Sequence, residues 1–165
     1  MENGEVQQLE VDKQDEDDKY PNGQTRRNGT VEPSQTQPQR RDLRERTFRF
    51  ARNIVGLYVA LDRGILAQTL GRQTLRAGTS VGANYREADQ ARSKAEFIAK
   101  IGDCLKEADE TAYWLELISA EAVSPSERVA PLIDEANQLV AILATIRRRA
   151  QERMEKGERK MENKL

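Results

Sequence analysis

Five polar residues fall where the sequence places the interior of a helical protein. Arg76, Ser80 and Asn84 recur every four residues, so they share one side of a predicted helix. Glu107 and Glu110 lie three residues apart on the next predicted helix. Because a buried polar group is costly unless it is paired, we expect a network joining Arg76 and Asn84 to Glu107 or Glu110. The simpler role of such a network is to fix helix register, and the alternative is a carboxylate site for a small ligand or for catalysis.

Histidine is absent from the sequence, and cysteine occurs once, at Cys104. Catalytic Ser-His-Asp and Cys-His triads and the Glu-x-x-His motif of di-iron bundles are therefore excluded in their usual forms. A zinc site would need further thiolates or imidazoles. Cys104 falls on an apolar stripe and is interpreted as a small core residue. We predict a non-enzymatic protein without cofactor or metal, and an enzyme built on carboxylates, lysine or arginine is the least favoured alternative.

Arginines concentrate along the first predicted helix and near the end of the last one. The candidate nucleic-acid contacts are Arg44, Arg46, Arg49, Arg52, Arg147, Arg148, Arg149 and Arg153. In an antiparallel bundle these two groups lie at the same end and form one basic pole. Arginines there can bind the phosphates of RNA or DNA without reading their sequence. The simpler interpretation is a solvated charged surface, because glutamates are interleaved with the arginines.

Charge is distributed unevenly along the 165 residues, whose formal net charge is -1. Residues 1–42 carry ten acidic and six basic groups, whereas residues 43–165 carry 18 acidic and 21 basic groups. The first segment has few large apolar side chains, and it cannot bury enough surface to offset its ordering entropy. We predict a disordered polar tail over residues 1–42. No apolar run reaches the roughly 18 residues of a membrane span, so we predict a cytoplasmic protein without membrane contact.

Apolar spacing after residue 42 predicts four helices and no strands. They cover residues 43–61, about 67–91, 93–120 and 124–156, with residues 157–165 as a frayed charged C-terminus. Short connections between four helices predict an all-α, up-down-up-down antiparallel bundle over residues 43–156. We expect one domain of this kind behind the polar tail.

The apolar stripes predict which helix faces are buried. Phe50 and Ile54 form the centre of the first stripe, and we expect Phe48, Val55 and Tyr58 to widen it. The second stripe is expected to include Asn84 among small residues.

Cap residues and glycines mark the ends and contacts of these helices. Ser93 followed by Glu96 is typical of a capping box, and Ser124 is expected to cap the fourth helix. Gly78 and Gly82 are costly in a helix, by roughly 1 kcal/mol each relative to alanine. We therefore expect them to allow close approach of a neighbouring helix.

Residues 73–117 resemble a known family, the small bacterial four-helix bundle proteins related to the 23S rRNA intervening-sequence protein. The resemblance rests on Gln73-x-x-Arg76-Ala77, Thr79-Ser80-Val81-Gly82-Ala83-Asn84, Arg92-Ser93-Lys94-x-Glu96-Phe97 and Glu107-x-x-Glu110-Thr111-x-Tyr113-Trp114-Leu115. It implies a four-helix bundle that assembles as a barrel-shaped homopentamer. The related accessory protein of diversity-generating retroelements implies binding to nucleic acid and to a reverse transcriptase through a basic surface.

The residues and the resemblance together favour one function. We expect a non-enzymatic, oligomeric accessory or scaffold protein that binds nucleic acid, or a nucleic-acid enzyme such as a reverse transcriptase, through its basic pole. The alternative is a protein–protein assembly module that binds no nucleic acid.

Overall fold

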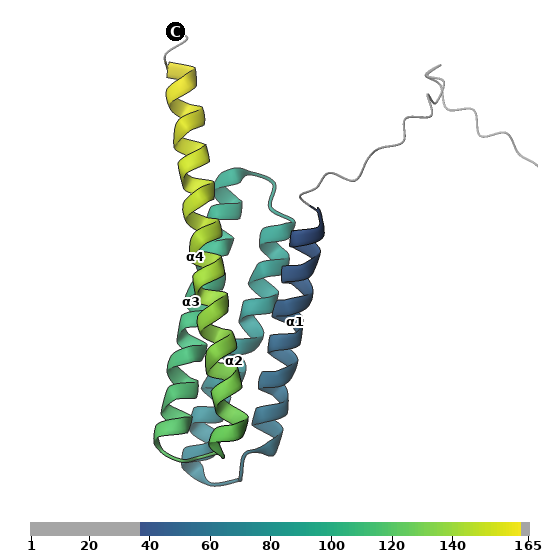
Figure 1. Ribbon diagram of the computed structural model, residues 1–165, viewed down its shortest axis with the longest axis vertical. Coiled ribbons are helices and arrows are strands. Elements are labelled where there is room, and N and C mark those ends of the chain that lie inside the picture. Colours follow the sequence, from purple (N-terminus) through teal and green to yellow (C-terminus); the bar gives the residue numbers. More distant parts are fainter. Residues whose placement is uncertain (1–36, 163–165) are drawn as a thin grey trace, which may run out of the picture. The chain divides into compact units, whose positions relative to one another are not determined.

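The computed structural model describes residues 37–162, which form four α-helices (Figure 1). The helices are α1 (Gln37–Ala60), α2 (Ile65–Asp89), α3 (Lys94–Ala120) and α4 (Ser126–Glu162). Successive helices run in opposite directions, and no strand occurs in this part of the chain. The predicted all-α antiparallel four-helix bundle is therefore confirmed.

The helices pack in sequence order rather than in an evenly closed ring. Contacts between α2 and α3, between α3 and α4, and between α1 and α2 are extensive, whereas α1 and α4 touch only sparsely. The side of the bundle between α1 and α4 is consequently its least closed side.

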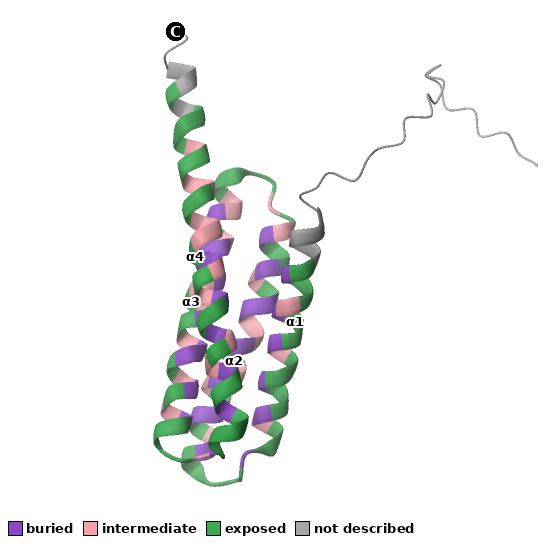
Figure 2. Cartoon of the chain, in the orientation of Figure 1, coloured by how far each residue is buried: buried purple, intermediate pink, exposed green. Residues whose placement is uncertain are grey.

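The core runs the length of the bundle between the four helices (Figure 2). Its centre includes Phe50 and Ile54 of α1, Val81 of α2, Leu115 of α3 and Leu139 of α4, each at most 1% exposed. Full burial of a side chain of this size contributes about 1.5–3 kcal/mol. The apolar spacing of the sequence therefore identified the centre of the core.

The width of the first apolar stripe was predicted wrongly at two of its three flanking residues. Tyr58 packs partly against the core, as expected. Phe48 and Val55 are each 43% exposed, and Val59 is 75% exposed. Because α1 packs mainly against α2, it buries a narrow face, and these three residues lie on its outer surface. Apolar character alone did not reveal this exposure, although the Arg86 guanidinium of α2 lies over the Phe48 ring, 5.3 Å from its centroid.

Two helices extend beyond their predicted ends. Helix α1 begins at Gln37, within the segment expected to be a polar tail, and residues 1–36 lie outside the described part of the chain. Helix α4 continues to Glu162, into the segment expected to fray. Ion pairs one turn apart accompany this extension, at 4.0 Å between Arg148 and Glu152 and 3.7 Å between Glu155 and Arg159. Exposed pairs of this kind contribute about 0.3–0.5 kcal/mol each.

Helix α3 is held at both ends by local hydrogen bonds. At its start, Ser93 Oγ accepts from the Glu96 N–H at 3.1 Å, as predicted, while the Glu96 carboxylate accepts from the Arg92 N–H at 2.7 Å. At its end, the N–H of Val123 donates to the Ile118 carbonyl at 3.0 Å, and Ala122 adopts a left-handed φ of 48°. This is a Schellman motif with alanine where glycine is usual.

Helix α4 begins at Ser126, slightly after Ser124, which the sequence predicted as its cap. The Ser124 side chain is buried. Over part of its length α4 is apolar enough to pass a compositional test for a membrane span. The apolar residues concerned include Val129, Leu132 and Leu139, which are buried in the bundle core.

The small residues of α2 lie against α1. A Cβ atom added to Gly78 would lie 2.8 Å from Ile54 Cγ1, and one added to Gly82 would lie 3.4 Å from the Thr47 carbonyl oxygen. The two helices therefore approach closely at these glycines, as their positions predicted.

Candidate functional site

Part of the expected polar network joins α2 to α3. The Arg76 guanidinium donates to Glu110 Oε1 in an ion pair, and Trp114 Nε1 donates to the same oxygen at 3.1 Å. Ser80 Oγ donates to the Arg76 carbonyl at 2.8 Å, so the serine bonds within its own helix instead of reaching α3. This arrangement ties two helices together at the bundle surface.

Asn84 and Glu107 do not join that network. Asn84 is half-buried and forms no hydrogen bond within the described part of the chain, so the expected network does not include it. Tyr85, only 5% exposed, takes the core position instead. A straight α-helix drifts by about 20° per heptad relative to a strict seven-residue repeat. The seam of α2 consequently moves from Val81 to Tyr85.

Glu107 carries a buried oxygen, Oε2, without a hydrogen-bond partner. Desolvation raises the pKa of Glu107, and the nearby negative charges of Glu110 and Asp103 raise it further, against the opposing effect of Arg76. Among the residues that the structure describes, no group of carboxylates and Cys104 is arranged to hold a metal ion.

Cys104 is fully buried, and its thiol donates to the Val81 carbonyl at 3.1 Å. Burial raises the pKa of Cys104 to about 12. The thiolate, which is the nucleophilic form, is therefore suppressed at neutral pH.

Arg46 serves as a clamp between α1 and α4. Its Nε and Nη2 donate to the two carboxylate oxygens of Glu135 at 2.7 and 2.8 Å, and Nη2 also donates to Gln138 Oε1 at 2.7 Å. The hydrogen bonds to Glu135 raise the pKa of Arg46. This bidentate geometry occupies the guanidinium edge that would bind a phosphate.

Two further candidate arginines form ion pairs, and a third, Arg147, packs against α3 with a buried Nε that has no hydrogen-bond partner in the described part of the chain. Arg44 forms an ion pair with Asp89 at 3.7 Å, and Arg148 pairs with Glu152. Arg147 is half-buried against Gly102, where an added Cβ would lie 3.4 Å from Arg147 Nε. Gly102 thus makes room for this side chain on α3.

The remaining candidates, Arg49, Arg52, Arg149 and Arg153, are exposed and form no ion pair within the described residues. Their positions divide into two places. Arg153 lies at the end of the bundle where α1 begins and α2 ends, whereas the other three line the open side between α1 and α4.

We define the α1–α4 groove as three adjoining hollows of about 480, 550 and 480 Å³ along that open side. The first two hollows share Asp42 and Arg46, and the second and third share Asn53. Arg149 lines one end of the groove, and Arg128, which the sequence did not single out, lines the other. The groove is therefore continuous and predominantly basic.

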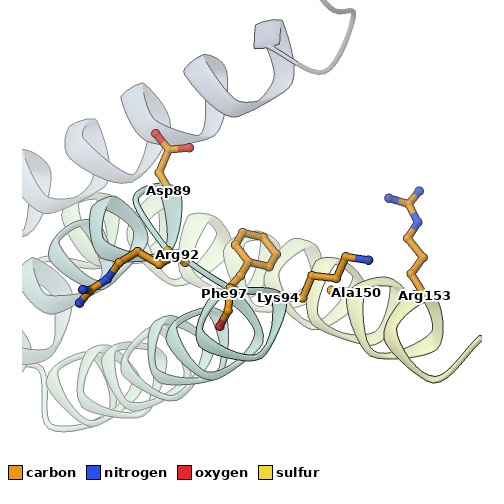
Figure 3. Close-up of a pocket in the computed structure, with 9 residues that line it drawn as sticks. Asp89, Arg92, Lys94, Phe97, Ala150 and Arg153 are labelled. Atoms are coloured by element: carbon orange, nitrogen blue, oxygen red, sulfur yellow. The ribbon is translucent and has the colours of Figure 1, made fainter. Parts of the chain in front are cut away.

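We define the pole cavity as the hollow of about 570 Å³ where the end of α2, the start of α3 and α4 meet (Figure 3). Arg92, Lys94 and Arg153 supply its positive charge, and Phe97 supplies its aromatic ring. In Figure 3 the Lys94 and Arg153 side chains extend on one side of the Phe97 ring, and Arg92 extends on the other. Asp89, the acidic residue of the lining, is the partner of Arg44.

The sequence did not identify Arg92 and Lys94 as functional candidates. Both lie at the break between the second and third predicted helices, on either side of the cap Ser93. Two cations on either side of a helix N-cap could have indicated an anion-binding site in the sequence, because the N-terminus of a helix is itself electropositive and adds to their charge.

The family of 23S rRNA-intervening sequence proteins matches residues 40–145. The chain belongs to this family. A crystal structure from the S23 ribosomal protein family of Bacteroides thetaiotaomicron, of a protein with unknown function, is 37% identical with a TM-score of 0.62. The similarity covers 66% of this chain and 97% of the Bacteroides chain. No curated protein matches the chain.

The match to the 23S rRNA-intervening sequence proteins covers most of the bundle but not all of the candidate surface. It includes the Arg46 clamp, the Arg76–Glu110 pair and the Arg92–Lys94 side of the pole cavity. It ends before Arg149 and Arg153. The basic end of α4 therefore lies beyond the part of this chain that matches the family.

Proposed function

We propose that this family member is a non-enzymatic accessory protein that binds nucleic acid through a basic pole formed by Arg92, Lys94 and Arg153. The observation that supports it is the convergence of Arg92, Lys94 and Arg153 on one cavity from segments far apart in the sequence. Arginine and lysine bind phosphates through charge and hydrogen bonds without reading the bases.

The surroundings of the pole favour an anionic ligand. Residues 43–165 carry a net charge of +3, from 21 basic and 18 acidic groups. The first turn of α3, which contributes Lys94, also lies at the positive end of the helix dipole. The acidic member of the cavity lining, Asp89, is offset by Arg44 at 3.7 Å.

A filter-binding titration with a labelled oligonucleotide at 50 and 200 mM salt tests the proposal. We expect retention at low salt and a steep loss at high salt, because bound counterions are released on association. The double variant Lys94→Glu/Arg153→Glu is expected to weaken binding and to reduce the salt slope by about 1.4–1.8, since each lost phosphate contact removes about 0.7–0.9.

Arg63→Glu is the matched control, because Arg63 is an exposed arginine in the α1–α2 connection at the opposite end of the bundle. It is expected to change binding little. Absence of retention at low salt, or an equal loss for Arg63→Glu, would contradict a role of the basic pole.

A second candidate is an assembly module without nucleic-acid binding. It is favoured by the exposed apolar residues Phe48, Val55 and Val59, which lie on the outer face of α1. Contiguous exposed apolar surface marks protein interfaces. Both candidates include self-association, and a homopentamer is the form that we propose.

Light scattering measures this assembly directly. A pentamer has a mass of five times 18.7 kDa, and a monomeric mass would exclude it. Co-purification with a reverse transcriptase supplied in trans separates an enzyme partner from nucleic acid alone. In either case we propose a cytoplasmic location, where nucleic acid and such enzymes are accessible.

A further inference from the structure

We propose that the pole cavity receives an unstacked base of single-stranded nucleic acid against Phe97, while Lys94 and Arg153 hold a neighbouring phosphate. This inference rests on the nucleic-acid binding proposed above and specifies the form of the ligand. Single-stranded binding sites combine a positively charged surface with aromatic rings on which bases stack. The pole cavity brings both components together.

Phe97 is the aromatic component. It lies in the first turns of α3, is half-buried, and packs partly against the core cluster. Unlike Ile101 and Cys104 further along the same apolar stripe, which are fully buried, Phe97 lines the cavity. The ring is thereby fixed by the core while part of it borders open space.

The cavity has the size for a base. Its volume of about 570 Å³ falls within the range of roughly 300–1,000 Å³ in which proteins bind small molecules. Its lining is neither purely apolar nor purely charged. An aromatic ring, two small residues of α2 and the connection, Ala88 and Ala91, and three cations surround the space.

The positions of the cations match a strand that passes the cavity. Lys94 and Arg153 extend on the α4 side of the Phe97 ring, and Arg92 extends on the opposite side (Figure 3). A strand whose base enters the cavity has one phosphate on each side of the sugar. Lys94 and Arg153, which extend on the same side of the ring, therefore suit the phosphate on that side of the sugar.

This arrangement distinguishes a single strand from a duplex. In a duplex the bases are stacked on each other and paired, so only the backbone reaches the rim of the cavity. A single strand can turn one base out of its stack and add an aromatic contact to the same phosphate contacts. We therefore infer that single-stranded ligands bind more tightly than duplexes of equal length.

Fluorescence anisotropy with a labelled 20-nucleotide oligo-dT and a 20-base-pair duplex tests this inference on the full chain at 50 mM salt. We expect tighter binding of the single strand. Phe97→Leu keeps an apolar side chain but removes the ring, and it is expected to weaken oligo-dT binding about fivefold or more, the lower end of aromatic stacking. Duplex binding is expected to stay unchanged.

Two further variants separate stacking from folding. Phe97→Trp retains an aromatic face and is expected to preserve the preference for the single strand. Phe48→Leu removes a second partly exposed phenylalanine, on the outer face of α1 and away from the pole cavity, and is expected to leave both affinities unchanged. Circular dichroism melts verify that each variant is folded.

The outcomes distinguish the two proposals. Equal binding of both oligonucleotides, or an unchanged single-strand affinity in folded Phe97→Leu, overturns the inference and leaves the basic pole as a phosphate-binding surface. Absence of binding to both oligonucleotides overturns the proposed function and the inference with it.

Discussion

Replacing Gly78 by alanine tests how closely α1 and α2 are packed. Alanine is favoured over glycine in a helix by about 1 kcal/mol. At Gly78, however, the added Cβ would lie 2.8 Å from Ile54 Cγ1 and 3.0 Å from Ile54 Cγ2, and Ile54 is fully buried. Overpacking of a core costs about 1–3 kcal/mol. The net effect of Gly78→Ala is expected to lie between neutral and about 2 kcal/mol destabilising, from these two magnitudes.

Gly56 supplies the matched control within α1. It is exposed, and a Cβ added there meets no atom within 4 Å. Gly56→Ala is therefore expected to stabilise the protein by about 1 kcal/mol. The difference between the two variants, about 1–3 kcal/mol, isolates the steric cost at the helix contact.

A double variant assigns that cost to Ile54. Ile54→Ala removes both γ carbons that the new Cβ would meet, so Gly78→Ala is expected to become stabilising in that background. Ile54→Ala alone costs about 2–5 kcal/mol. Urea denaturation at a fixed protein concentration measures all four free energies of unfolding, since assembly makes stability concentration-dependent. If Gly78→Ala stabilises the original chain as much as Gly56→Ala does, the close contact is refuted.

Four smaller perturbations test other features. Arg46→Ala is expected to lower the free energy of unfolding by about 1 kcal/mol by breaking the clamp to Glu135, whereas Arg49→Ala changes it little in the same urea assay; equal effects would contradict the clamp. Ala122→Gly relieves a left-handed alanine and is expected to stabilise by up to about 1 kcal/mol, with a lower melting temperature as the contrary result. The pKa of Glu107 is raised in the folded state above its usual 4.5. Protonation of Glu107 therefore favours folding, and this contribution to stability is lost as the pH rises through the folded-state pKa. The melting temperature of Glu107→Gln is expected to exceed that of the original chain at pH 7 and to converge with it at acidic pH. Cys104, whose pKa burial raises to about 12, is expected to react with Ellman's reagent at pH 8 only after unfolding, and rapid modification of the folded protein would contradict its burial.

The buried faces could be predicted because they follow from the periodicity of one chain segment at a time. Phe50 and Ile54 recur at helical spacing, and the structure buries both. Phe48 and Val55 are equally apolar, but their exposure depends on the absence of a helix beside them. That information is not contained in the spacing of α1. Local capping at Ser93 was likewise predictable, because its partner lies three residues away.

The candidate site was less predictable because its parts come from distant segments. Arg46 and Glu135 are 89 residues apart in sequence, so their pairing depends on how α1 and α4 lie side by side. The pole cavity combines Lys94 of α3 with Arg153 of α4. The list of arginines in the sequence did not show which side chains are engaged in internal ion pairs, as Arg44, Arg46 and Arg148 are.

The sparse contact between α1 and α4 gives the bundle a linear series of interfaces, α1 to α2 to α3 to α4. Separating α2 or α3 from the rest disrupts two extensive interfaces, whereas separating α1 disrupts one extensive interface together with the Arg46 clamp. Local opening that releases α1 therefore costs less free energy than local opening that releases α2 or α3. Its release uncovers the α2 surface at Gly78 and Gly82, where small residues already permit the close approach of another helix. Helix α1 of a second copy of the chain would fit that surface equally well. The packing order that leaves the α1–α4 groove open therefore also makes α1 the helix with the lowest barrier to exchange between copies.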